Sequence, residues 1–149
     1  MFDLSEKVAI VTGSSRGIGR GIAQQLAKQG ARVVITSRKL EPCEAVVEEI
    51  KQAGGEAIAV ASNVGHKEDV TKLVEQTVEA YGRLDIVVCN AAANPAFGPM
   101  QVLEDAAFDK IMRVNLQSNI WLCNLAGPHM AKVGGGSMIL ISSITALDG

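Results

Sequence analysis

Aromatic side chains are scarce in this sequence, since Phe, Trp and Tyr together make up 3% of its 149 residues. Hydrophobic residues still account for 48%, so the core must be mainly aliphatic, as in a parallel sheet buried beneath helices. Long apolar runs are also missing, and the run at residues 138–141 is far too short to cross a bilayer. The first residues lack the basic region and apolar stretch of a signal peptide. These absences argue against a membrane-spanning or secreted protein.

Charge of one sign does not gather anywhere along the chain. The 14 Lys and Arg residues are interspersed with 16 Asp and Glu residues, which gives a net charge of −2, so we expect no nucleic-acid partner. The sequence has only three cysteines, Cys43, Cys89 and Cys123, and no two of them form a C-x-x-C pair. We interpret them as reduced core residues of a cytoplasmic protein and expect neither a disulfide nor a metal site.

Short apolar runs alternate with stretches of helical spacing. Five runs are predicted to be strands, at residues 8–11, 32–36, 57–61, 84–89 and 137–141. Each is apolar throughout rather than alternating, which predicts burial on both faces. Between them, residues such as Ile18, Ile22 and Leu26 share one helical stripe. The order predicts an α/β fold with a doubly wound parallel sheet between two helix layers, in one domain spanning residues 1–149.

The most informative segment is residues 12–19, TGSSRGIG, which follows the first strand and opens the first helix. Gly13 permits a sharp exit from the strand, Gly17 leaves room for a ligand to approach, and Gly19 allows close helix–sheet packing. The helix N-terminus offers unpaired N–H groups and a partial positive charge to a diphosphate. A plain glycine-rich turn is the competing interpretation. We therefore expect a dinucleotide cofactor to bind at Gly13, Ser14, Ser15, Arg16, Gly17, Ile18 and Gly19.

The T-G-x-x-x-G-x-G spacing resembles the short-chain dehydrogenase/reductase family, in its simple NAD(P)-dependent oxidoreductase branch. The resemblance runs along the whole chain and implies a Rossmann-type fold with its first five strands in the order 3-2-1-4-5. It also implies that a carbonyl and an alcohol of a small-molecule substrate are interconverted by hydride transfer. Because members of the family are usually dimers or tetramers, a homo-oligomer is expected.

The end of the second strand normally distinguishes NAD from NADP. An acid at this point binds the ribose 2′-hydroxyl, whereas a basic residue accommodates a 2′-phosphate. Here Ser37 stands at the position of the acid and Arg38 follows it. Together with Arg16 and the Ser15 hydroxyl, these residues make a plausible phosphate clamp. We therefore expect NADP(H) in preference to NAD(H), the alternative being that both arginines are solvated surface charges.

Two further segments match the family in part. Asn63-Val64 stands where relatives have Asp-Val at the adenine, and an Asn side chain can still donate and accept hydrogen bonds there. After the fourth strand, relatives read Asn-Asn-Ala-Gly, whereas this chain reads Cys-Asn-Ala-Ala. The resemblance implies that the cofactor groove is walled by Asn63, Val64, Asn90, Ala91 and Ala92.

The resemblance implies two catalytic residues. Asn115 shares a stripe that we expect to face the core with Phe108, Ile111, Met112 and Leu116. A buried amide needs a partner, and in the family this Asn bonds backbone and a water that leads protons to the active site. A purely structural bridge would be compatible with that role. Ser143, after the fifth strand, resembles the serine that binds the substrate carbonyl oxygen, with Ser142 as the alternative.

The family's general acid/base, a Tyr in a Tyr-x-x-x-Lys motif, is absent from these 149 residues. The only tyrosine, Tyr81, has Asp85 rather than Lys four residues later, and it completes an apolar helix stripe. We expect Tyr81 to be a core or helix-end residue. We also expect the chain to be the first part of a longer protein and to be inactive alone. A natural short product, a non-catalytic NADP(H)-binding module and a fragment that serves only assembly are the alternatives.

Overall fold

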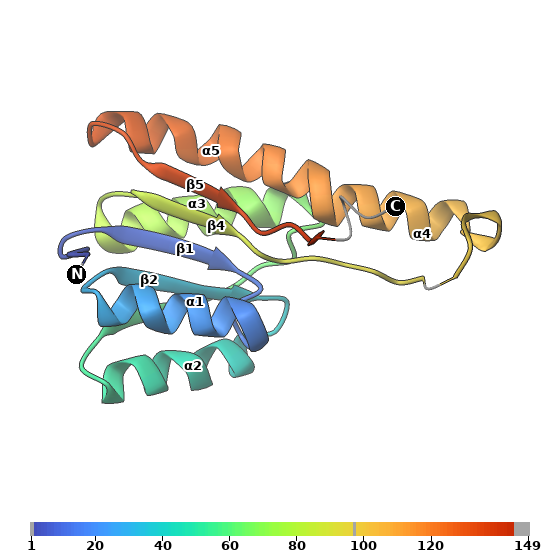
Figure 1. The fold of residues 1–149 in the computed structure, drawn as a ribbon. Coiled ribbons are helices and arrows are strands. Elements are labelled where there is room, and N and C mark those ends of the chain that lie inside the picture. Colours follow the sequence, from blue (N-terminus) through green and yellow to red (C-terminus); the bar gives the residue numbers. More distant parts are fainter. Residues whose placement is uncertain (1, 97, 145–149) are drawn as a thin grey trace.

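The sheet has five parallel strands. The computed structural model describes residues 2–96 and 98–144 (Figure 1). The strands pair in the order β3-β2-β1-β4-β5, which confirms the predicted topology. They are β1 (Val8–Thr12), β2 (Arg32–Ser37), β3 (Glu56–Ala61), β4 (Ile86–Cys89) and β5 (Ser137–Leu140). Because every strand is parallel, all five carboxyl ends lie at one edge of the sheet, and the strand order reverses there between β1 and β4.

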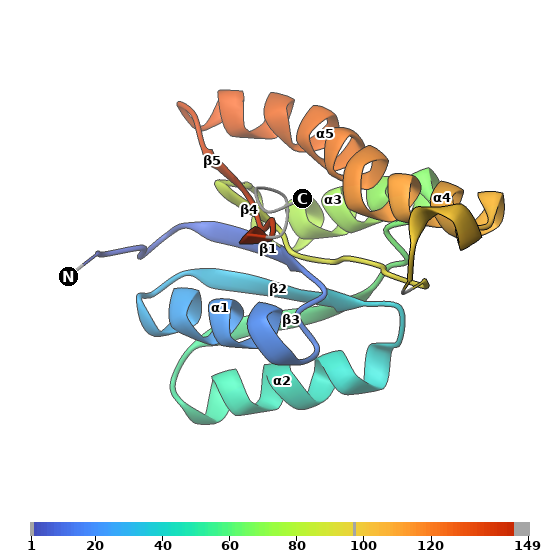
Figure 2. The same cartoon turned by 45° about the vertical axis from the view of Figure 1, so that its right-hand side comes forward.

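Helices cover both faces of the sheet, which confirms the predicted three layers. Helices α1 (Gly17–Lys28) and α2 (Leu40–Gln52) lie on one face, and α3 (Lys67–Tyr81) and α5 (Ser118–Lys132) lie on the other (Figures 1 and 2). Successive residues of a strand point to opposite faces. Ala9 and Val11 therefore pack beneath α1 and α2, whereas Val8 and Ile10 pack beneath α3 and α5. Val8, Ala9, Ile10 and Val11 of β1 are completely buried, which confirms the predicted burial of this strand on both faces.

The two edge strands, β3 and β5, are less buried than predicted, since Ala61 of β3 and all of β5 are exposed. Met138, Ile139 and Leu140 are 36%, 45% and 55% exposed. The apolar run was expected to be buried on both faces. Strand β5 pairs only with β4 among the described strands, and its side chains remain exposed to solvent. An apolar sequence indicates that a strand is suited to burial, but its actual burial depends on the elements that pack against it.

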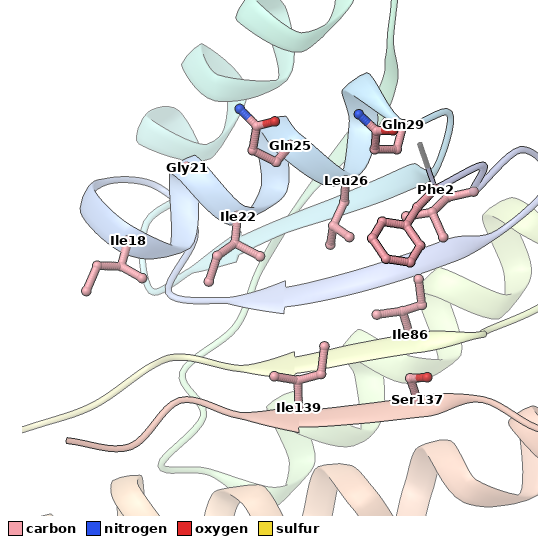
Figure 3. Close-up of a pocket in the computed structure, with 11 residues that line it drawn as sticks. Phe2, Ile18, Gly21, Ile22, Gln25, Leu26, Gln29, Ile86, Ser137 and Ile139 are labelled. Carbon is pink, nitrogen blue, oxygen red and sulfur yellow. The ribbon is translucent and has the colours of Figure 1, made fainter. Parts of the chain in front are cut away.

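The predicted stripe of α1 is only partly buried, since Ile22 and Leu26 pack against the core whereas Ile18 is 69% exposed. The fully buried residues of the helix are the small ones, Gly19, Ala23 and Ala27, which allow it to approach the sheet closely. The residues of the predicted stripe also line an apolar groove of about 760 Å³ between α1 and strands β4 and β5 (Figure 3). The groove is lined by Phe2, Leu4, Ile18, Ile22, Leu26, Ile86 and Ile139, with Gly21, Gln25, Gln29 and Ser137. It contains no charged side chain that could hold a phosphate.

A long helix leads to β5 after a short 3-10 turn, η1 (Met100–Val102). It consists of α4 (Asp105–Met112), a π-helical turn η2 (Arg113–Gln117) and α5. The stripe around Asn115 was expected to face the core, and this expectation is wrong. Phe108, Met112 and Leu116 are 48%, 40% and 50% exposed, because this part of the helix projects beyond the strand ends (Figure 1).

Candidate cofactor site at the carboxyl edge of the sheet

The turn between β1 and α1 presents uncapped helix amides. Gly13 and Gly17 have φ of 65° and 56°, a left-handed conformation that favours glycine. Arg16 precedes the helix and makes no side-chain capping hydrogen bond, and the first turn of α1 contains no acidic residue. Space is open around the position of a Cβ on Gly17. The N-terminus of α1 can therefore accept an anion without competition from its own side chains.

Gly19 brings α1 against the ends of both central strands. A Cβ at this position would lie 2.5 Å from Asn90 Nδ2 and nearer still to the Gly13 carbonyl oxygen. Both contacts are too close for any side chain, so the role predicted for Gly19, close packing of the helix, is consistent with this geometry. The Ile18 side chain faces the apolar groove, so its backbone N–H is the group it can offer to a ligand.

Thr12 joins β1 to the end of β4. Its Oγ1 accepts the N–H groups of Asn90 and Ala91 at 2.9 and 3.0 Å, and it donates to the Val88 carbonyl at 3.3 Å. Asn90 Nδ2 donates in return to the carbonyls of Thr12 and Gly13, at 2.9 and 3.3 Å. Asn90 and Ala91 therefore lie beside the glycine turn, and the Asn90 amide holds it in place. The sequence analysis assigned no role to Thr12, although a Thr at the end of a buried strand indicates that its hydroxyl needs a hydrogen-bond partner.

Ser14 is completely buried and engaged by the protein itself. Its Oγ donates to the Val11 carbonyl at 2.6 Å and accepts the Thr36 N–H at 2.9 Å, while its own N–H donates to the Thr36 carbonyl at 3.1 Å. The Ser14 hydroxyl and N–H are thus engaged within the protein, and the cofactor contact of Ser14 stays a prediction. Ser14 instead joins the turn to β2, and the half-buried Ser15 is the serine of the turn that lies nearer solvent.

The end of β2 has the features expected of a 2′-phosphate site. Arg38 and Arg16 are exposed, and Ser37 is half-buried at the last position of β2. The Ser37 Oγ donates to the Lys39 carbonyl at 3.0 Å. The clamp formed by these residues stays a prediction.

Asn63 and Val64 follow β3 and are half-buried. Asn63 Oδ1 accepts the Gly65 N–H at 3.1 Å, and the Asn63 N–H donates to Asp69 Oδ2 at 3.0 Å. The side-chain oxygen thus stabilises the turn into α3. The amide NH₂ of Asn63 is the group suited to the predicted adenine contact, since it can only donate.

Asn115 pins the segment after β4 to the long helix. Its Oδ1 accepts the Ala93 N–H at 2.7 Å and its Nδ2 donates to the Ala93 carbonyl at 2.9 Å. The amide does have the partner that was expected, although it is exposed rather than buried. Asn119, which sequence reasoning missed, donates through Nδ2 to the Asn115 carbonyl at 2.8 Å. Asn115 lies in the π-helical turn, a feature frequent at functional sites.

Ser142 and Ser143 lie just beyond β5 and are exposed. The Ile141 N–H donates to the Cys89 carbonyl at 3.0 Å, so the chain still follows β4 at that point. Both serines are therefore near the carboxyl edge where Asn90 and Ala91 lie. The predicted choice of Ser143 over Ser142 remains a prediction.

Tyr81 lies at the opposite end of the sheet. It is half-buried against the core beneath α3, and its ring stacks under the Arg32 guanidinium at 5.2 Å. Burial, with a contribution from Glu56, raises the pKa of Tyr81 to about 12. The prediction of a core or helix-end residue is confirmed, and Tyr81 is remote from the glycine turn.

Asp85 anchors the same end of the sheet. Its buried carboxylate accepts the Val8 N–H at 3.0 Å and two hydrogen bonds from Arg83 at 2.8 and 2.6 Å, with Lys7 at 3.4 Å. Burial alone would raise the pKa of Asp85, but the Arg83 and Val8 hydrogen bonds and the positive charges outweigh it and lower the pKa. This cluster stabilises the fold and belongs to no ligand site.

Cys43 and Cys89 are buried and Cys123 is half-buried, close to the predicted pattern. Within residues 2–96 and 98–144, no group of three or more His, Cys, Asp or Glu side chains could hold a metal ion. In the same part of the chain, no helix combines the length and apolar character needed to span a bilayer.

Comparison with known proteins supplies an independent test of these features. The sequence model of the short chain dehydrogenase family matches residues 7–149. Short-chain dehydrogenase/reductase SDRA of Arabidopsis thaliana is 43% identical over 145 residues, which cover 97% of this chain and 56% of that protein. Dehydrogenase/reductase SDR family member 4 of Bos taurus is 41% identical over 143 residues, covering 96% and 51%. The chain thus spans about half the length of the curated relatives it matches.

Solved structures agree with the sequence matches. A metagenomic short-chain oxidoreductase in complex with NADP is 40% identical, with a TM-score of 0.90 over 94% of this chain and 63% of that one. A putative short-chain alcohol dehydrogenase from Sinorhizobium meliloti is 36% identical, with a TM-score of 0.94 over 99% and 58%. The Rossmann-like fold of the present chain is therefore the fold of these proteins.

Proposed function

This chain belongs to the short chain dehydrogenase family, and from that premise we propose that it binds NADP(H) at the carboxyl edge of its sheet. The protein would use the cofactor to interconvert a carbonyl and an alcohol of a small molecule. We assign residues 1–149 to the dinucleotide-binding part of a single domain. The expected homo-oligomeric state and cytoplasmic location belong to the same proposal.

The uncapped N-terminus of α1 is the observation that carries the proposal. Its free amides stand beside the reversal of strand order between β1 and β4, where open α/β sheets bind ligands. By contrast, the first turns of α2 and α3 contain acidic residues, which would repel a phosphate. The helix dipole and the glycine turn therefore favour a diphosphate at α1 over α2 and α3.

The preference for NADP(H) rests on the end of β2. Ser37 and Arg38 present a hydroxyl and a guanidinium where an acid would exclude a 2′-phosphate, and Arg16 adds a second exposed charge. A family neighbour of known structure was solved with NADP. NAD(H) remains the alternative cofactor.

Hydride donation or acceptance at the nicotinamide is the chemistry that the cofactor supplies. This chain would contribute a hydroxyl for the substrate oxygen, from Ser143 or else Ser142, and stabilise the charge that develops on that oxygen. Asn115 would hold the segment at Ala93, beside the strand end that carries Asn90 and Ala91. These residues position and stabilise, and none of them is a general acid for the reaction.

A titration tests the cofactor proposal. We expect NADPH to bind saturably and more tightly than NADH, followed by the fluorescence of the reduced nicotinamide. Arg38→Asp should reverse that preference, because a carboxylate repels the 2′-phosphate and accepts from the 2′-hydroxyl. Lys72→Asp, the same charge change at an exposed site on α3, is the matched control and should leave the ratio unchanged. Failure of both dinucleotides to bind to folded protein would refute the proposal, and an unchanged ratio in Arg38→Asp would refute the clamp.

A non-catalytic NADP(H)-binding role is the second candidate for these 149 residues alone. It is favoured by the position of the only tyrosine, Tyr81, at the end of the sheet opposite the glycine turn. With no phenol near the site, we expect little or no NADPH oxidation with a panel of ketones. Turnover comparable to that of longer relatives would exclude this candidate.

A further inference from the structure

Three polar groups close the turn between β2 and α2. The Ser37 Oγ donates to the Lys39 carbonyl at 3.0 Å, and the Cys43 thiol donates to the same carbonyl at 3.3 Å. The Ser37 Oγ and the Cys43 Sγ are 3.2 Å apart. Cys43 is completely buried, whereas Ser37 is partly open to solvent beside Arg38. The partly exposed Ser37 hydroxyl thus lies in contact with the buried Cys43 thiol.

The Lys39 carbonyl has more donors than it needs. It belongs to the residue that precedes α2, whose carbonyl accepts the first hydrogen bond of the helix. A carbonyl oxygen has two lone pairs, so the Ser37 hydroxyl and the Cys43 thiol compete for the one that remains. Burial raises the pKa of the Cys43 thiol, so the thiol keeps its proton and remains a donor at neutral pH. The Ser37 hydroxyl can therefore leave Lys39 without depriving the second lone pair of that carbonyl of a donor.

We propose that Cys43 is a positioning residue for the 2′-phosphate of the cofactor and acts through Ser37. When a phosphate occupies the site beside Arg38, the Ser37 O–H turns to a phosphate oxygen and the Cys43 S–H takes the remaining lone pair of the Lys39 carbonyl. No bond is made or broken other than hydrogen bonds, and the thiol does not touch the ligand. This inference rests on the proposed NADP(H) function and explains how a serine already engaged by the protein can serve an anion.

Alanine and serine at position 43 separate this role from simple packing. In Cys43→Ala, the Ser37 hydroxyl is the one side-chain donor left for the second lone pair of the Lys39 carbonyl, so we expect NADPH and 2′,5′-ADP to bind about fivefold more weakly. NADH and 5′-ADP lack the 2′-phosphate and should bind as they do to the wild type. Cys43→Ser retains a donor and should recover most of the loss. Cys123→Ala, at a half-buried cysteine of α5, is the matched control and should change neither affinity.

A double-mutant cycle with Ser37→Ala completes the experiment. Once the hydroxyl is gone, Cys43→Ala should cause no further loss of NADPH affinity, because the thiol acts only through Ser37. Equal weakening of NADPH and NADH, or additive losses in the double variant, would overturn the inference in favour of a merely structural thiol. If the wild type binds 2′,5′-ADP and Ser37→Ala weakens it but Cys43→Ala does not, the inference fails alone. If the wild type binds neither NADPH nor 2′,5′-ADP, the proposed function fails together with this inference.

Discussion

Replacing Thr12 by Val tests whether the glycine turn is held by the strand ends. The two side chains have nearly the same shape, so the change removes the hydroxyl and little else. Thr12 Oγ1 makes three hydrogen bonds, with Asn90, Ala91 and Val88, and the residue is 2% exposed. At about 1 kcal/mol for each net hydrogen bond, the loss is about 3 kcal/mol in the free energy of unfolding. With an m-value of about 2 kcal/mol/M, the urea midpoint should fall by about 1.5 M.

Thr36 supplies a matched control, because it is the same residue type at a similarly buried position on the neighbouring strand. It is the partner of Thr12 in the register between β1 and β2, and it is 1% exposed. Its Oγ1, however, has no hydrogen-bond partner within residues 2–96 and 98–144. A buried hydroxyl without a partner is unfavourable, so Thr36→Val should raise the free energy of unfolding by about 1 kcal/mol. The same substitution on adjacent strands is thus expected to have opposite signs.

Urea unfolding followed by circular dichroism measures the free energy of unfolding of both variants. Titration of Thr12→Val with NADPH measures whether the glycine turn still binds the cofactor. Because the Thr12 hydroxyl fixes the backbone of Asn90 and Ala91 beside the glycine turn, Thr12→Val should also weaken NADPH and NADH together. Thr12→Ser keeps the hydroxyl and should retain most of the affinity. Equal changes in stability for Thr12→Val and Thr36→Val would refute the reasoning, since burial alone would then explain both.

Three further predictions concern packing, charge and reactivity. Gly19→Ala should lower the free energy of unfolding by about 3 kcal/mol and abolish tight NADPH binding, because the new Cβ would overlap backbone atoms. Gly21→Ala lies in open space and should instead raise the free energy of unfolding by about 1 kcal/mol by stabilising α1. Urea unfolding checks both variants. Asp85→Asn should cost about 3 kcal/mol at pH 7. The lowered pKa of Asp85 gives stability that is present above its unfolded pKa, near 4, and lost as the pH falls through the folded pKa, so the two proteins should converge in acid urea titrations. Burial, together with Cys123, raises the pKa of Cys89 to about 12, so a disulfide reagent should modify Cys123 first, as mass spectrometry of peptides would reveal.

The sequence contains the signals for the central fold because those signals are local. The runs at residues 8–11 and 32–36 are continuous and apolar, and both proved to be strands buried on two faces. The helix ends at Gly30, Gly54 and Gly82 follow from a positive φ that glycine supplies. The turn at residues 13–19 combines a strand, spaced glycines and a helix start, so its geometry was also predictable.

Burial and partners were less predictable because they depend on distant segments. The predicted strand order placed β5 at an edge, but nothing within residues 137–141 indicates that all of its side chains would be exposed. The Asn115 amide was correctly expected to have a partner, but the helix around it lies beyond the sheet rather than in the core. Thr12 and Asn90 are 78 residues apart, and their contact arises only once the sheet is assembled. Even the Ser37–Cys43 contact, with six residues of separation, corresponds to no recognised sequence pattern.

The two ends of the proposed cofactor site are built differently, and this difference predicts how they should respond to substitution. At the diphosphate end, Thr12, Ser14 and Asn90 fix the glycine turn through buried and partly buried hydrogen bonds to backbone, so the amides of α1 are arranged before any ligand arrives. At the 2′-phosphate end, exposed arginines and a hydroxyl with a replaceable partner leave the geometry to the ligand. Substitutions in the first group should therefore weaken NADPH and NADH alike, while those at Ser37 and Arg38 should alter the ratio between them. A variant of Thr12 that changes only the ratio would contradict this division of roles.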